Sequence, residues 1–268
     1  MGKSRIGNQC FRAIILVFIF MALCLVVAAI GNILWSGTID LVKCLQSAEI
    51  QFSIRLSFLT AFASTLLCMV IAIPIAYGLE RMRLRGRQLI GIIFDVPMAL
   101  PPLVSGLALL LLFATTGLGQ ALARYGINFI FTVQGIVLAQ FFVNLPYLIR
   151  FLRSTIADVD PRLEFVARTL GCTQWQAFYK VILPLIRNGL LAGLVTTWSR
   201  ALGEFGAVLM LAGATRMKTE ILPTSLYLNL ATGDLDLAMA AAVVLILVSL
   251  LSLLVFELLG RSSVTLSR

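Results

Sequence analysis

Histidine is absent from this 268-residue chain, and charged residues are scarce at 12%. The lack of histidine removes the commonest metal ligand and proton shuttle among side chains. The five cysteines form no C-x-x-C pair and most lie in or near apolar runs, so they indicate neither a disulfide framework nor a metal site. There is also no G-x-x-x-x-G-K-[ST] phosphate-binding loop and no constellation of paired carboxylates. We therefore expect neither an enzymatic site nor a cofactor in this chain.

Apolar residues dominate instead, at 60% of the sequence, with a mean hydropathy of +1.01. A soluble domain has about 45–50% apolar and about 25% charged residues. The excess forms long runs, which predict a single-domain, all-α polytopic membrane protein. Six spans are predicted at about residues 11–34, 54–79, 88–114, 130–150, 188–212 and 235–259. The first run is too long for the usual apolar core of a secretory signal, so we interpret it as a span.

The net charge of +9 could suggest nucleic acid, but the basic residues gather in alternate loops. Lys and Arg mark the cytoplasmic side of a membrane protein. This pattern predicts a multi-pass protein of the cytoplasmic membrane with both termini in the cytoplasm, in contact with lipid and not with nucleic acid. The side so assigned holds Lys3, Arg5, Arg12, Arg81, Arg83, Arg85, Arg87, Arg150, Arg153, Arg162, Arg168, Lys180, Arg187, Arg261 and Arg268. The opposite side holds Lys43, Arg55, Arg124, Arg216 and Lys218.

Several residues predicted at membrane depth are unusual for a span. Proline removes a backbone donor and frees carbonyls, which is tolerated where the backbone faces protein or a water-lined cavity. The prolines of the third span can therefore be a structural kink or the wall of a pathway. The candidates for a translocation pathway or gate are Pro101, Pro102, Ser105, Gln140, Asn144, Arg200 and Glu204.

Arg200 and Glu204 are the strongest of these intramembrane signals. They stand four residues apart, so on a continuous helix they would share a face. Charges at membrane depth are expensive and usually face a partner or a cavity. Two interpretations stay open: the side chains neutralise each other as a structural pair, or they line a polar pathway, in which an arginine would favour an anion.

A polar segment interrupts the spans between residues 158 and 184, reading DPRLEFVARTLGCTQWQAFYKVILP from Asp160. Asp160 followed by Pro161 predicts a helix start. Gly171 predicts its end, and Thr173 with Gln176 forms a capping box for a second helix. Trp175, Phe178, Tyr179 and Ile182 give that second helix an aromatic and apolar stripe. Such a helix pair suits docking into a groove of a partner protein, and it also suits lying on the lipid surface.

The same segment resembles the cytoplasmic loop of ATP-binding cassette importer permeases. The pattern of that family is EAA, three residues, Gly, nine residues, Ile, one residue and Leu-Pro. Gly171, Leu183 and Pro184 match in spacing, and Ala167 matches the last alanine. Phe165, Val166 and Val181 depart from the pattern, and Glu164 lies one position before the expected glutamate. The residues assigned to ATPase coupling by this resemblance are Glu164, Ala167, Arg168, Gly171, Cys172, Thr173, Trp175, Leu183 and Pro184.

Three further segments resemble the molybdate, tungstate and sulfate branch of that family: PMALPPLVSG from Pro97, VLAQFFVNLPYLIRFLR from Val137 and SRALGEFGAVLMLAG from Ser199. The resemblance implies a type I importer permease that forms a homodimer and binds two cytoplasmic ATPase subunits, which hold ATP and Mg²⁺. An external binding protein would deliver the oxyanion. It implies import of molybdate or tungstate by alternating access, with sulfate or thiosulfate as the alternative. A secondary transporter driven by an ion gradient is a further alternative, though few ionisable residues lie in the spans.

Overall fold

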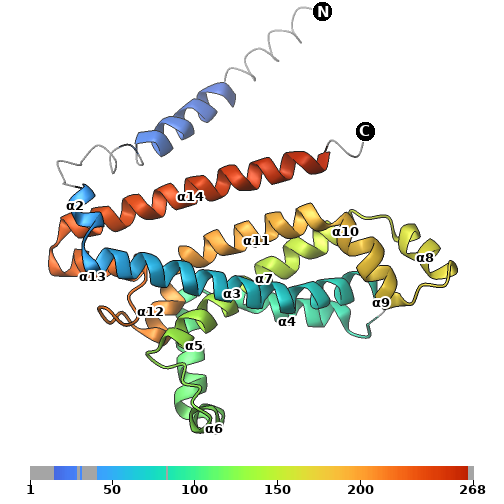
Figure 1. Cartoon of the computed structure of the whole chain (residues 1–268), viewed down its shortest axis with the longest axis horizontal. Helices are drawn as coiled ribbons and strands as arrows, with labels where there is room; N and C mark the ends of the chain where they lie inside the picture. The colour runs from blue at the N-terminus through green and yellow to red at the C-terminus, as the bar shows by residue number, and fades with distance from the viewer. Residues whose placement is uncertain (1–14, 29–30, 32–40, 83, 265–268) are drawn as a thin grey trace, which may run out of the picture.

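Every regular element is a helix in the part of the chain that the computed structural model describes, residues 15–28, 31, 41–82 and 84–264 (Figure 1). This confirms the all-α prediction. An apolar helix, Ile15–Ala28, comes first. It is followed by α2 (Leu41–Leu45), α3 (Ala48–Arg81), α4 (Arg87–Ala99), α5 (Pro102–Thr115), α6 (Gly117–Arg124), α7 (Val133–Ala157), α8 (Pro161–Thr169), α9 (Gln174–Ala177), the π-helical turn Phe178–Ile182, α10 (Leu183–Leu185), α11 (Arg187–Leu202), α12 (Gly206–Ala212), α13 (Leu222–Thr232) and α14 (Leu235–Val264).

Three of the described helices are long and apolar enough to cross a bilayer without interruption: α3, α7 and residues Leu235–Leu258 of α14. Two bent pairs, α4 with α5 and the segment Gln174–Leu185 with α11, would raise that number to five. The first predicted span, 11–34, is represented by the shorter helix Ile15–Ala28, and its remaining residues except Gly31 lie outside the described part. The count of six therefore stays a prediction.

The predicted third span is sharply broken and not merely kinked. The axes of α4 and α5 meet at 108° across Leu100 and Pro101. Both of these residues have extended backbone, with ψ of 144° and 138°. Proline disfavours helical geometry in the residue before it, and two consecutive prolines extend this restriction over two positions. Pro102 then occupies the first helical position of α5, where its missing N–H costs nothing.

The packing centre of the molecule is the pair α3 and α7, whose C-terminal ends lie together. Arg81, the last residue of α3, donates hydrogen bonds to the carbonyl oxygens of Ile156 and Val159 at the end of α7. The buried face of α3 is rich in small hydroxyl residues such as Thr60 and Ser64, which bond to carbonyls of their own helix. Small side chains let the backbones of membrane helices approach closely, and this close packing helps to hold such helices together in lipid.

Two groups of short helices lie at opposite ends of this bundle, and α6 projects from its side (Figure 1). The loop formed by α8, α9 and α10 lies at one end, beside the C-terminal end of α3. The helices α2 and α13 lie at the opposite end, from which α14 runs back along the bundle. The described molecule thus carries one folded polar element at each end of its apolar helices.

Candidate functional site

The first helix of the polar loop begins and ends where the sequence predicts. The carboxylate of Asp160 accepts a hydrogen bond from the N–H of Arg162 at 2.9 Å, and Pro161 opens α8. At the other end Gly171 has φ of 94°, a left-handed conformation that favours glycine. Two bonds close the helix in a Schellman arrangement: Cys172 N–H to Ala167 O and Gly171 N–H to Arg168 O, both 3.1 Å. The turn between the two loop helices is therefore fixed by backbone hydrogen bonds.

The second loop helix also starts as predicted and then changes its winding. Thr173 and Gln176 form both bonds of the capping box, at 3.2 and 2.9 Å. Helix α9 then passes into a π-helical turn closed by the Leu183 N–H and Phe178 O. Proline 184 explains this widening, because its ring would clash with the carbonyl four residues earlier in a regular α-helix. The loop thus continues into α10 and α11 without an unstructured linker.

The loop is bound to the bundle through α3. The hydroxyl of Tyr77 donates a hydrogen bond to the carboxylate of Glu164 at 2.5 Å, and both residues are buried. The ring of Tyr77 also lies 4.7 Å from the ring of Phe178, centroid to centroid. Both loop helices therefore contact the same residue of α3. A movement of the loop would be transmitted directly to that long helix.

Away from the bundle, the loop presents apolar side chains to solvent. We call this set the loop apolar face; it consists of Leu163, Phe165, Val166, Leu170, Trp175 and Tyr179, which are between 47% and 80% exposed. The predicted stripe of the second helix is divided by the structure. Phe178 and Ile182 are buried against α3 and α7, so only Trp175 and Tyr179 belong to the exposed face.

The other predicted coupling residues surround this face. Ala167 of α8 is buried, and Cys172 and Leu183 are half-buried. Arg168, Thr173 and Pro184 are exposed. The structure therefore brings all the loop candidates into one compact element, in which Glu164 and Ala167 face the protein and the remainder lie at or near the surface.

Two of the predicted pathway residues, Gln140 and Asn144, are completely covered. The Nε2 of Gln140 donates to the carbonyl of Ala201 at 2.9 Å, and the Nδ2 of Asn144 donates to Gln140 O at 2.8 Å. The Gln140 bond joins α7 to the end of α11, and the Asn144 bond stays within α7. Their amide oxygens, like the buried hydroxyl of Ser105, have no hydrogen-bond partner in the described chain. By contrast, Pro101 and Pro102 are exposed at the break between α4 and α5.

The prediction that Arg200 and Glu204 share one helix face is wrong. Helix α11 ends at Leu202, because the chain leaves helical geometry at Gly203 to Phe205 before α12 begins. Glu204 turns toward α12, where its Oε1 accepts from the Ala207 N–H at 3.2 Å. Arg200 instead stacks over the ring of Tyr147, with 3.7 Å from Cζ to the ring centroid. Among the described residues, no hydrogen bond or ion pair joins Arg200 to Glu204.

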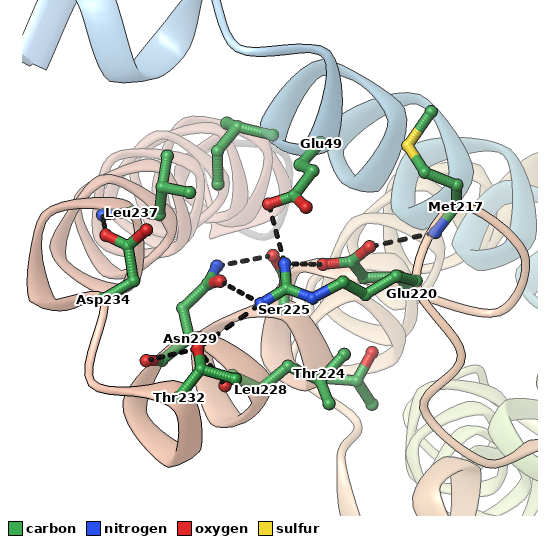
Figure 2. A network of polar contacts seen from close by, with 12 residues as sticks. Glu49, Met217, Glu220, Thr224, Ser225, Leu228, Asn229, Thr232, Asp234 and Leu237 are labelled. Atoms are coloured by element: carbon green, nitrogen blue, oxygen red, sulfur yellow. Dashed lines mark hydrogen bonds and ion pairs between the residues drawn. The ribbon is translucent and has the colours of Figure 1, made fainter.

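The end of the bundle opposite the polar loop contains a polar network that the sequence did not reveal (Figure 2). Arg216 donates to Glu49 at 2.7 Å and to the side-chain oxygen of Asn229 at 2.9 Å, and it lies 3.9 Å from buried Glu220. Glu220 in turn accepts from the Met217 N–H. Because Glu49 and Arg216 are 167 positions apart, no local pattern indicates the pairing. The network connects the start of α3, the loop before α13, and α13 itself.

Comparison with known proteins identifies the family to which this chain is similar. Residues 69–263 match the family described as "Binding-protein-dependent transport system inner membrane component". The chain belongs to this family. It is the permease subunit of an ATP-binding cassette importer, and thus a multi-pass protein of the inner membrane.

Its relatives differ in the substrate that their names state. The chain is 35% identical over 212 residues to the sulfate transport system permease protein CysT of Escherichia coli, covering 79% of this chain and 76% of that protein. It is 40% identical over 205 residues to the molybdenum transport system permease protein ModB of Mycobacterium tuberculosis, covering 76% and 77%. Both kinds of permease are relatives, so these names do not decide which substrate this chain carries.

Solved structures support the fold. A bacterial alginate ABC transporter in complex with its alginate pentasaccharide-bound periplasmic protein matches with a TM-score of 0.71 and 18% identity, covering 98% of this chain and 95% of that one. A methionine ABC transporter, MetNI, in inward-facing conformations matches with a TM-score of 0.59. At these identities the likeness concerns the fold alone.

Proposed function

We propose that this chain imports a tetrahedral oxyanion, molybdate or tungstate, using ATP that a separate subunit hydrolyses. The observation that carries the proposal is the polar loop: a rigid helix pair with an exposed apolar face, hydrogen-bonded through Glu164 to Tyr77 of α3. The chain has no phosphate-binding loop of its own, so the ATPase and its Mg²⁺ belong to a partner.

The loop apolar face suits a protein groove. Amphipathic helices dock by placing spaced apolar anchors into such grooves, and aromatic residues contribute much of the binding energy at interfaces. Leu170 and Trp175 are the most exposed members, at 80% and 71%, and they flank the turn at Gly171. We therefore place the ATPase contact at this turn, in the cytoplasm, on the side to which the basic residues also assign the chain termini.

The mechanism follows from the stiffness of this connection. Two copies of the chain would form the permease, each carrying one ATPase subunit. When ATP binding closes the ATPase pair, the two docked loops approach each other. Because both loop helices contact Tyr77, the movement passes to α3 and through it to α7 as a rigid-body rotation of helices. The pathway then opens outward to a binding protein, and hydrolysis with product release returns it inward.

The substrate class rests on the named relatives and on the charge of the spans. Sulfate and molybdate are both tetrahedral dianions, and the chain is similar to permeases named for each. Transport of sulfate or thiosulfate is therefore the second candidate function. Since few ionisable side chains lie in the spans, we expect the binding protein to choose between these anions. Calorimetric titration of that protein with molybdate, tungstate and sulfate decides between the two candidates.

Replacement of Leu170 by glutamate tests the docking surface. A charge placed in an apolar groove must be desolvated, so Leu170→Glu is expected to reduce co-purification of the ATPase at least tenfold and to abolish ATP-dependent uptake. Tyr125→Glu is the matched control, because Tyr125 is 84% exposed and ends α6, which lies away from the loop (Figure 1). Full ATPase retention by Leu170→Glu, with loss in Tyr125→Glu, would place the contact elsewhere.

A further inference from the structure

Arg200 occupies an unusual position for a cation in a membrane protein. Its guanidinium lies on the ring of Tyr147, which belongs to the middle part of the 25-residue span α7. At 1.5 Å per residue, Tyr147 is roughly 15–21 Å from either end of that helix. Yet Arg200 is exposed on the surface of the chain. A guanidinium is costly in hydrocarbon, so this part of the surface must face water, a second copy or an anion.

The guanidinium also lacks an acceptor among the described residues. It carries five N–H donors, and its one recorded contact is the face of the Tyr147 ring. The nearest acidic residue in sequence, Glu204, is used to cap α12. A cation–π contact holds the plane of the guanidinium in place while its edge donors stay free. The arrangement is a fixed positive charge whose edge donors are available to a ligand.

The surrounding backbone indicates that this surface does not face lipid. Arg200 stands directly before the break between α11 and α12, and that break touches the other one, between α4 and α5. A Cβ on Gly206 would lie 3.0 Å from Leu103 N and 3.1 Å from Pro102 Cβ. Non-helical backbone at membrane depth occurs where protein or a water-filled cavity covers it. In transporters, interrupted helices of this kind surround the substrate.

We propose that Arg200, held by Tyr147, binds the transported oxyanion transiently at mid-membrane. This deepens the proposed function and rests on it. The planar fork of the guanidinium matches two oxygens of a tetrahedral dianion. A single arginine per chain gives weak binding, which is what passage requires, since a tightly held ion does not leave. Two copies of the chain would contribute two such residues to one pathway.

A cysteine placed beside Arg200 tests the proposal without measuring transport. Gly203 is exposed, has φ of −86°, and an added Cβ would meet nothing closer than 3.8 Å, so Gly203→Cys fits. In a variant without native cysteines, assembled with its ATPase in proteoliposomes, we expect an anionic methanethiosulfonate to react at least on the order of threefold faster than a cationic one. Arg200→Gln should abolish this preference, Arg200→Lys should keep it, and millimolar molybdate or sulfate should slow the anionic reaction.

Ser199→Cys serves as a second probe if Gly203→Cys does not fold. Val70→Cys, on an exposed position of α3, is the control and should show no preference that depends on Arg200. No reaction with either reagent would mean that lipid or a second copy covers Arg200, and would overturn the proposal. A preference unchanged by Arg200→Gln, or one shared by Val70→Cys, would overturn it equally. The readout is a labelling rate and not transport. The predicted preference can therefore be absent while ATP-dependent uptake persists, and it can be present when uptake fails.

Discussion

At the scale of single residues, Glu164 attaches the loop to the bundle. It stands one position before the glutamate of the family pattern, yet it is buried and accepts a hydrogen bond from Tyr77. Phe165, which occupies the pattern position itself, is 67% exposed and belongs to the loop apolar face. The one-residue offset is explained by the helix: Glu164 lies on the side of α8 that faces α3, and Phe165 does not. The carboxylate therefore fastens the loop to the bundle.

Removing the hydroxyl of Tyr77 tests this fastening. Tyr77→Phe leaves a buried carboxylate without its donor, at a cost of about 1–3 kcal/mol. We expect a lower unfolding temperature in detergent and fewer oxyanions imported per ATP, because a loosened loop transmits less movement. The control is Tyr125→Phe, at an exposed position. Unchanged coupling in Tyr77→Phe, with normal ATPase binding, would show that the loop moves the bundle through other contacts.

At the scale of elements, the sequence predicted the features that neighbouring residues determine, but not the features that depend on residues distant in the chain. Asp160, Gly171 and the capping box of Thr173 set helix ends through neighbours three or four residues away, and the structure confirms all three. The angle of 108° between α4 and α5 could not be predicted, because prolines determine where a helix breaks but not its new direction. The shared face of Arg200 and Glu204 failed because Gly203 ends the helix between them.

The polar network around Arg216 also belongs to the scale of elements, because Arg216 connects α3 to α13. Arg216→Gln removes the positive charge between Glu49 and buried Glu220, which leaves two carboxylates uncompensated. We expect a loss of about 1–3 kcal/mol of stability and faster proteolysis near α13. Lys218→Gln, two residues away and exposed, should have little effect. Equal stability of the two variants would mean that the network adds nothing to the anchoring of α13.

At the scale of the whole molecule, the chain divides its tasks between the ends and the middle of the bundle. The polar loop offers an exposed apolar face, the network around Arg216 connects α3 to α13, and the broken helices meet between them. The long parallel packing of α3 on α7 connects these parts. As the permease subunit of an ATP-binding cassette importer, the chain works together with other proteins.

The most direct test of the central claim is uptake into proteoliposomes that contain this chain with its ATPase and binding protein. Radiolabelled molybdate, tungstate and sulfate would be measured with and without ATP on the side of the loop. The account predicts uptake that requires ATP and persists when an uncoupler collapses the ion gradients. Uptake that proceeds without ATP and stops with the uncoupler would contradict it and identify a secondary transporter.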